Sequence, residues 1–394
     1  MDSPIINFDN TKEAFKNRST QDLKETEWLF KMLNNKILGG IGKPLLKFAV
    51  NIGLPVKGII KATLYKHFVG GETLEECLPL VDKLAKDNVK AILDFSEEGK
   101  ADEKEIEHAF LSLLENIHFA GNHKKIPLTV FKPSAIGAHS LLEKVSSGAV
   151  LNKRETEEWN HFARRFEQLC EAAHSENIPV MIDAEEFSTQ KAMDDMANLM
   201  MEKYNKERVT VINTFQMYRN DRLNYIKECH ALAKQKGYML GAKLVRGAYM
   251  EKERARAAEK GYPSPIHNTK AETDKAYNDA VRYCMGHIDD MFLFVGTHNE
   301  DSSRLAAELI AQSGHPNDFH HLWFSQLLGM CDHISFTLGH LGYNVAKYVP
   351  YGPVKTVTPY LIRRADENSS VAGQAGKEME LLEKELKRRR KAGK

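Results

Sequence analysis

The run VKAILDF, at residues 89–95, is the first of eight short apolar stretches that decide the fold. The other seven are IPLTVF (126–131), IPVMID (178–183), VTVINTF (209–215), LGAKLV (240–245), MFLFVG (291–296), HHLWF (320–324) and VAKYVP (345–350). Most of them are continuously apolar, which is typical of strands buried on both faces of a parallel sheet. Longer segments with helical periodicity separate most of the runs. The sequence therefore predicts an α/β fold, a (β/α)8 barrel of the TIM type.

The barrel is expected to occupy residues 88–376. Residues 1–87 are predicted to form an N-terminal helical arm, and residues 377–394 a charged helical tail. No glycine-rich dinucleotide fingerprint follows any of the apolar runs, which argues against a Rossmann domain.

Composition excludes several classes of protein. The 394 residues include 55 Lys+Arg and 54 Asp+Glu, for a formal net charge of +1, so a globally basic nucleic-acid binder is excluded. The five cysteines are far apart and form no C-x-x-C pair, which indicates a reducing compartment without a disulfide framework. The N-terminus shows neither a signal nor a transit pattern, and no apolar run is long enough to span a membrane, so we expect a cytoplasmic location.

Two segments leave peripheral association with the inner face of a membrane open. Residues 37–70 are strongly apolar but interrupted by lysines, so they either pack on the core with outward lysine stems or touch lipid. The tail KELKRRRKAGK, at 384–394, is either a solvated charged end or a binding element for an anionic partner.

The ends of the predicted strands locate the site, because barrel chemistry lies at the carboxyl ends of the strands. Most positions just past the apolar runs are polar: Glu98, Lys132, Asp183, Gln216, Arg246, Thr297, His298, Asn299, Gln326 and Tyr348. No second His or Cys falls at metal-ligand spacing near His298, so no metal is predicted. The pairs His320-His321 and Asp332-His333 are interpreted as surface or helix-cap residues.

The segment PYLIRRADENSS, residues 359–370, is the most informative. On a helix, Tyr360, Arg363, Arg364 and Glu367 share one face at i, i+3, i+4 and i+7. Two guanidiniums on that face can converge on a small carboxylate, and Lys132 could add a third positive charge. The alternative is an exposed amphipathic helix with an Arg363–Glu367 pair.

The segment GAKLVRGAYM, residues 241–250, is suited to a flat ligand. Gly247 and Ala248 present almost no side chain, so the backbone can approach closely. Strand alternation points Lys243 inward, and Arg246 can donate to a phosphate or a ring carbonyl. The alternative is an ordinary turn between a strand and a helix.

These motifs carry a family resemblance. LDFSEE, VFKPSAIG, MIDAEE, NTFQMY, KLVRGAY, THN, LLGMCDHIS and YVPYGP followed by PYLIRRADENSS resemble, in order and spacing, the motif set of the proline dehydrogenase (proline oxidase) family. The resemblance runs from about residue 89 to 370 and is to the monofunctional eukaryote-type branch. The bifunctional bacterial enzymes carry Arg where Lys243 stands and Lys where Arg246 stands.

The resemblance implies a barrel, a bound FAD and a role for each matching residue. The proline carboxylate would be bound by Arg363, Arg364 and Lys132, and the ring would be enclosed by Tyr348, Tyr360 and Leu327. The active-site residues would be Asp183 and Lys243. Tyr249 would lie near the flavin, and Glu98 would act as a gate. FAD would be held by Ala184, Gln216, Lys243, Val245, Arg246, Gly247, Ala248, Thr297, His298, Asn299 and Glu367.

The implied reaction is oxidation of L-proline to Δ1-pyrroline-5-carboxylate, the first step of proline catabolism, with electrons passed to a membrane quinone. Two alternatives stay open at this stage. One is a hydroxyproline dehydrogenase. The other is a lyase of a different class, which would use Lys132 or Lys243 as a Schiff base on the same barrel.

Overall fold

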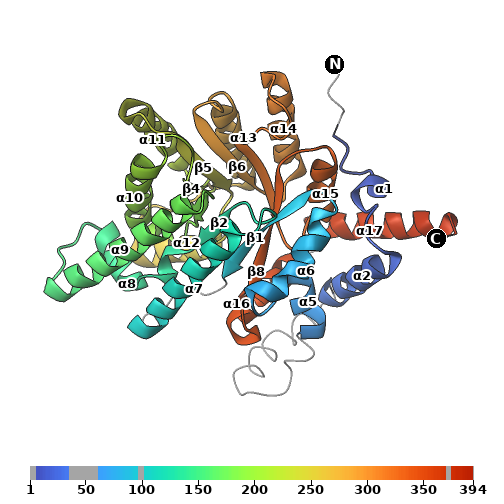
Figure 1. Ribbon diagram of the computed structural model, residues 1–394, viewed down its shortest axis with the longest axis horizontal. Helices are drawn as coiled ribbons and strands as arrows, with labels where there is room; N and C mark the ends of the chain where they lie inside the picture. The colour runs from blue at the N-terminus through green and yellow to red at the C-terminus, as the bar shows by residue number, and fades with distance from the viewer. Residues whose placement is uncertain (1–5, 35–60, 96–101, 370–373, 394) are drawn as a thin grey trace. The chain divides into compact units, whose positions relative to one another are not determined.

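The computed structural model describes residues 6–34, 61–95, 102–369 and 374–393 (Figure 1). Its eight strands form one sheet in the order β1-β8-β7-β6-β5-β4-β3-β2. The strands are β1 (Val89–Phe95), β2 (Thr129–Phe131), β3 (Val180–Ile182), β4 (Val211–Gln216), β5 (Leu240–Val245), β6 (Met291–Gly296), β7 (Leu322–Leu327) and β8 (Val345–Tyr351). Sequential strands pair in parallel from β2 to β6, and β1 pairs in parallel with β8. The predicted (β/α)8 barrel is confirmed.

Helices separate the strands as the periodicity predicted. They are α7 (Glu103–Gly121), α8 (His139–Ser146), α9 (Lys153–Ser175), α10 (Phe187–Tyr204), α11 (Arg222–Lys236), α12 (Met250–Lys260), α13 (Lys270–Met285), α14 (Glu300–Ser313), α15 (Asp332–His340) and α16 (Val354–Ser369). A 3-10 turn, η2 (Pro133–Ala135), follows β2. Helices α1 (Thr11–Ala14), α2 (Thr20–Asn34), α5 (Lys66–Phe68) and α6 (Leu74–Ala85), with the π-helix η1 (Lys61–Tyr65), precede β1, and α17 (Gln374–Lys391) ends the chain.

Three strands, β1, β5 and β6, begin and end at the predicted residues. Four predicted strand ends differ from the structure by one to three residues, since β3 ends at Ile182, β4 at Gln216, β7 at Leu327 and β8 at Tyr351. β7 extends to Leu327, so Gln326 lies inside the strand rather than beyond it, because the polar pair Ser325-Gln326 interrupts the apolar run without interrupting the backbone. Tyr348 likewise lies in the middle of β8, opposite Ile92 of β1.

The chain forms two compact units, which are described separately. The first lies within residues 1–96, 298–300 and 325–394, and the second within 97–297 and 301–324. In the first unit, α17 packs against α1 and α2, and α16 packs against α2 (Figure 1). Their shared core is built from large apolar side chains, among them Phe15, Phe30, Phe68, Val357 and Leu386.

The second unit is built on strands β2 to β6 and the helices between them. Buried aromatic side chains join α9 to β2, since the Phe131 ring meets the Phe166 ring edge to face. Helix α9 begins at a capping box in which Asn152 and Glu155 each accept a hydrogen bond from the other's backbone N–H. That cap satisfies orphan N–H groups at the start of the unit's longest helix.

The structure describes only part of the two segments, 37–70 and 384–394, for which the sequence allowed membrane association. Residues 35–60 lie outside the described chain, whereas Tyr65 and Phe68 lie in the core of the first unit. The basic tail is helical, and Arg388 and Arg389 both pair with Glu385 on α17. Among the helices that the structure describes, none combines the length and the apolarity needed to cross a bilayer.

Candidate active site

A lysine–aspartate cluster lies at the strand ends of the second unit. Lys243, on β5, is only 5% exposed, and its Nζ lies 2.5 Å from Asp183 Oδ1. Asp183 follows β3 directly, and its backbone N–H donates to the Phe131 carbonyl, which fixes its position. Lys132, just after β2, has its Nζ 3.9 Å from the other oxygen, Asp183 Oδ2. The structure therefore brings three of the predicted residues together, with two cations beside one carboxylate.

Arg246 is held by side chains from two later segments. Its Nε lies 2.7 Å from Asp274 Oδ1, Nη1 2.7 Å from Thr297 Oγ1 and Nη2 3.0 Å from Ser302 Oγ. The guanidinium also lies over the Tyr277 ring, 4.4 Å from its centroid. Burial alone would raise the pKa of Asp274, but hydrogen bonds from Lys270 and Arg246 outweigh it and lower that pKa. Arg246 is thus a fixed cation joined to Thr297, a second predicted residue.

Gly247 needs to be glycine for a reason the sequence did not reveal. Its φ is +123°, and a Cβ there would lie 2.5 Å from the ring of Tyr218. The sequence predicted that the backbone at Gly247 approaches a flat group, and that group is at least in part the Tyr218 ring of this protein. Ala248 follows in the same turn, and Tyr249 is the residue before α12.

A buried carboxylate beside the predicted cofactor residues was missed. Glu185 accepts hydrogen bonds from the Ser134 backbone N–H, at 2.8 Å, and from Ser134 Oγ, at 2.5 Å. Gln216, at the end of β4, donates from Nε2 to the Glu185 carbonyl at 3.0 Å. Gln216 Oε1 is buried and has no hydrogen-bond partner within the described chain. The acidic pair that ends MIDAEE was the available signal for Glu185, because two adjacent carboxylates after a buried strand require partners.

In the first unit, His298 is oriented by the backbone of β7. The Leu327 N–H donates to His298 Nε2 at 3.1 Å, so Nε2 carries the lone pair. The next but one residue, Glu300, lies 3.0 Å from His333 Nε2 and 2.8 Å from Lys377 Nζ. Burial raises the pKa of Glu300, but the hydrogen bonds from His333 and Lys377 outweigh it and bring the pKa to about 2.

The interpretation of Asp332-His333 as surface or cap residues is wrong. Both side chains are buried, His333 against Glu300 and Asp332 against two cations. Asp332 Oδ1 lies 3.0 Å from Lys347 Nζ, and Oδ2 lies 2.6 Å from Arg18 Nη1. The partners come from distant parts of the sequence, so local patterns gave no signal for them. His321 is buried as well, and its Nδ1 lies 2.8 Å from the Ile288 carbonyl.

The arginine helix is α16, and its two arginines differ. Arg364 is 7% exposed, whereas Arg363 is exposed to solvent. The Arg364 guanidinium lies 5.1 Å from the centre of the Tyr360 ring, and Nη1 lies 4.0 Å from Met330 Sδ. Tyr348 is buried on β8, and Leu327 and Tyr360 are partly buried against the core of the first unit. Glu98 and the side chain of Glu367 lie outside the part of the chain that the structure describes.

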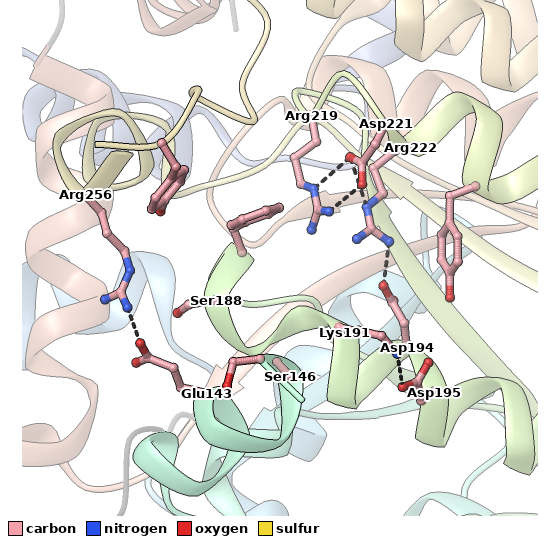
Figure 2. A pocket seen from close by; sticks show the side chains of 14 residues that line it. Glu143, Ser146, Ser188, Lys191, Asp194, Asp195, Arg219, Asp221, Arg222 and Arg256 are labelled. Atoms are coloured by element: carbon pink, nitrogen blue, oxygen red, sulfur yellow. Dashed lines mark hydrogen bonds and ion pairs between the residues drawn. The ribbon is translucent and has the colours of Figure 1, made fainter. Parts of the chain in front are cut away.

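A separate cavity of about 560 Å³ lies in the second unit beside α8, α10 and α11 (Figure 2). Its charged side chains pair with one another: Arg222 Nη1 lies 2.6 Å from Asp194 Oδ2, and Arg219 binds both oxygens of Asp221. Four cationic and four anionic side chains line it, so the walls carry no net charge. None of the residues predicted for the site lines this cavity.

Comparison with known proteins identifies relatives of the chain. A family model described as "Proline dehydrogenase" matches residues 77–377. The "Carbapenem antibiotics biosynthesis protein CarD" of Pectobacterium carotovorum subsp. carotovorum is 35% identical over 323 residues, covering 82% of this chain and 83% of that protein. "Proline dehydrogenase 1, mitochondrial" of Homo sapiens is 40% identical over 268 residues, covering 66% of this chain and 44% of that protein.

A third relative and one solved structure complete the comparison. The "Hydroxyproline dehydrogenase" of Xenopus laevis is 32% identical over 365 residues, covering 84% of this chain and 78% of that protein. The crystal structure of proline utilization A from Bdellovibrio bacteriovorus superposes with a TM-score of 0.72 at 20% identity, covering 91% of this chain and 38% of that one. The chain thus spans less than half of the human relative and of this solved structure, and the latter supports the barrel fold alone.

Proposed function

We propose that this chain, which belongs to the proline dehydrogenase family and is therefore an oxidoreductase, uses FAD to oxidise L-proline to Δ1-pyrroline-5-carboxylate. The observation that carries the proposal is the family match over residues 77–377, which includes all eight strands. It favours a dehydrogenase over the lyase alternative. The two lysines that a lyase could use as a Schiff base both face Asp183: Lys243 Nζ lies 2.5 Å and Lys132 Nζ 3.9 Å from its carboxylate oxygens.

Several of the residues predicted to hold a flavin have the chemistry to do so. Gln216 Oε1 is a buried acceptor without a partner in the described chain, and it suits the N–H of a flavin pyrimidine ring. Lys243 and Arg246 supply fixed cations, which would stabilise negative charge on a reduced ring. We propose that FAD is held by Ala184, Gln216, Lys243, Val245, Arg246, Gly247, Ala248, Thr297, His298, Asn299 and Glu367. When bound, FAD would supply the hydride acceptor, and the protein would supply orientation and charge.

Asp183 is proposed to orient cations rather than to abstract a proton. Its carboxylate lies between Lys243 and Lys132, so its charge is committed to them. A neutral proline amine needs no strong base once hydride leaves the adjacent ring carbon, because its own lone pair forms the C=N bond. Lys132 is proposed to bind the substrate carboxylate.

The remaining predicted residues are proposed to bind and enclose the substrate. Arg363 and Arg364 would bind the proline carboxylate by charge-assisted hydrogen bonds. Tyr348, Tyr360 and Leu327 would wall the pyrrolidine ring, Tyr249 would lie near the flavin, and Glu98 would serve as a gate. Holding the carboxylate fixes which ring carbon is presented for oxidation.

Electrons are proposed to leave for a membrane quinone, with the protein located in the cytoplasm at the inner face of the membrane. Hydroxyproline is a second candidate substrate, because a hydroxyproline dehydrogenase is among the relatives that match most of the chain.

The absorption spectrum of the purified protein, recorded before and after anaerobic addition of L-proline, tests the proposal. We expect a flavin spectrum that L-proline bleaches and NADH does not. Re-oxidation by a soluble quinone analogue, in the absence of oxygen, would support the proposed acceptor. Colourless protein that remains inactive after reconstitution with FAD would contradict the proposal.

A further inference from the structure

We propose that His230, His287 and Asp290 form a binding site for a divalent transition-metal ion of the Zn²⁺ type, separate from the predicted active-site residues. One ligand atom from each of these side chains lies within 4.8 Å of the other two. Two imidazole nitrogens and one carboxylate oxygen are a ligand set that suits Zn²⁺ and its neighbours rather than Ca²⁺ or Mg²⁺. All three residues belong to the second unit.

Local structure brings the three residues together. His230 lies on α11, which packs against α13. A short turn follows α13, in which the His287 N–H donates to the Cys284 carbonyl and the Asp290 N–H donates to the His287 carbonyl. Asp290 immediately precedes β6, so the cluster lies at the amino end of that strand. Barrel chemistry is expected at the opposite, carboxyl ends.

The geometry of His230 is compatible with a role as a metal ligand. Its ring is 2% exposed, and Nδ1 lies 2.9 Å from Tyr283 Oη, an outer contact that fixes the ring orientation. Its Nε2 is buried and lies 3.3 Å from Asp290 Oδ1. In a tetrahedral site with bonds of about 2.0–2.2 Å, neighbouring ligand atoms lie about 3.3–3.6 Å apart. The separation of these two atoms falls in that range.

His287 completes the set. Its ring lies 4.7 Å from the His230 ring, centre to centre, and both His287 and Asp290 are half-buried. A side-chain movement of about 1 Å would bring the most distant ligand atoms to tetrahedral spacing. Partial exposure also leaves room for water as a fourth ligand.

One neighbouring charge opposes a cation. Lys234 Nζ lies 3.3 Å from Asp290 Oδ2, the oxygen that does not face His230. The lysine therefore leaves Oδ1 for the ion but weakens its binding by like-charge repulsion. Removing this lysine charge should tighten binding, whereas removing any of the three ligands should weaken it. Opposite effects of neighbouring substitutions on the affinity for the ion distinguish a specific metal site from adventitious binding to surface histidines, since the chain contains 16 His.

The test uses the purified 394-residue protein, treated with EDTA, freed of the chelator and titrated with ZnCl₂ by isothermal calorimetry. We expect one equivalent to bind saturably, with binding about 10- to 100-fold weaker in His287→Gln and Asp290→Asn, and in His230→Gln where it folds. Lys234→Met should bind about three- to tenfold more tightly. Substituting CoCl₂ for ZnCl₂ should give the visible absorption of a four- or five-coordinate ion.

The control is His320→Gln, which removes an exposed histidine elsewhere in the same unit and should bind Zn²⁺ like the parent. Because His287 and Asp290 are half-buried, their variants are expected to fold, and circular dichroism checks this. Absence of saturable binding would overturn the proposal. Equal binding by the parent, His287→Gln and Asp290→Asn would overturn it as well. None of these measurements depends on proline oxidation, so failure here leaves the proposed function standing.

Discussion

Two lysines on barrel strands each pair with an aspartate, yet their surroundings differ. Lys243 on β5 meets Asp183, whose other oxygen faces a second lysine, Lys132. Lys347 on β8 has no exposed surface; besides Asp332 it donates to the backbone carbonyls of Leu327 and Met330. The first cluster is made of side chains at strand ends. The second cluster joins a strand to the turn before α15.

The comparison sets a lysine whose donors are all engaged within the fold against one that we propose serves the reaction. All three N–H donors of Lys347 are engaged with fixed acceptors, and Asp332 is bound from its other side by Arg18. The C-terminal helix closes this cluster, since Glu378 of α17 accepts from the Cys331 N–H at 2.8 Å. Such a cluster holds the fold. Asp183 also faces two cations, Lys243 and Lys132, but these stand at strand ends, where we propose that they serve the substrate and the cofactor.

The largest expected effect is the loss of stability in Lys347→Met. The variant leaves the Asp332 carboxylate buried with one cation fewer and strips two carbonyls of their donor. We expect the free energy of unfolding to fall by about 3–5 kcal/mol, because breaking a buried pair leaves an uncompensated charge. Denaturant unfolding of parent and variant measures this. A Lys347→Met protein as stable as the parent would remove the distinction between the two lysines.

Lys243→Met is expected to show the opposite pattern. Its cluster lies at strand ends and serves the proposed chemistry, so turnover should fall about 10²- to 10³-fold while the protein stays folded. The measurements are anaerobic flavin reduction by L-proline and the thermal midpoint of the same preparation. An unfolded Lys243→Met would show that this lysine is also structural, and a fully active one would remove its proposed role in the reaction.

The sequence predicted the fold more completely than the roles of its polar residues. β1, β5 and β6 were predicted to the residue, because uninterrupted apolar runs mark strands buried on both faces. The end of β7 was not, because Gln326 is a polar residue whose place in the barrel only the sheet defines. Lys347 carried no signal either: its partner Asp332 and that partner's second cation, Arg18, are separated by more than 300 residues.

The two arginines of α16 offer a sharper test within the first unit. Helical spacing could place them on one face but could not show that Arg364 is buried and Arg363 exposed. Replacing either one by Met should raise KM for L-proline, by about 10- to 100-fold for Arg364 and less for Arg363, with FAD still bound. Steady-state kinetics and flavin content decide this. Unchanged KM values in both variants would make α16 a structural helix only.

Tyr348 tests whether the first unit also selects the substrate. A buried phenol ring against the pyrrolidine would leave an added hydroxyl without a partner, at a cost of about 1–3 kcal/mol. We expect kcat/KM for L-proline to exceed that for trans-4-hydroxy-L-proline by about 10- to 100-fold, and Tyr348→Ser to narrow the gap. Equal efficiencies in the parent enzyme would favour hydroxyproline as an equally good substrate and would show that Tyr348 does not wall the ring.

The smallest expected effect is on acid stability, and it belongs to the Lys347 cluster. Burial would raise the pKa of Asp332, but the charges of Lys347 and Arg18 outweigh it and bring the pKa to about 2. A carboxyl whose pKa is lower in the folded than in the unfolded chain stabilises the protein above the unfolded value, about 3.9, and loses that contribution as pH falls toward 2. Between pH 5 and pH 3 the parent should therefore lose part of this contribution. Arg18→Met, which removes one of the two cations, should lose less over this interval. Arg390→Met, which removes an exposed cation on α17, should lose as much stability as the parent.

The free energy of unfolding of each protein, measured at both pH values, decides the matter. If Arg18→Met loses as much stability between pH 5 and pH 3 as the parent does, the acid sensitivity lies outside this cluster.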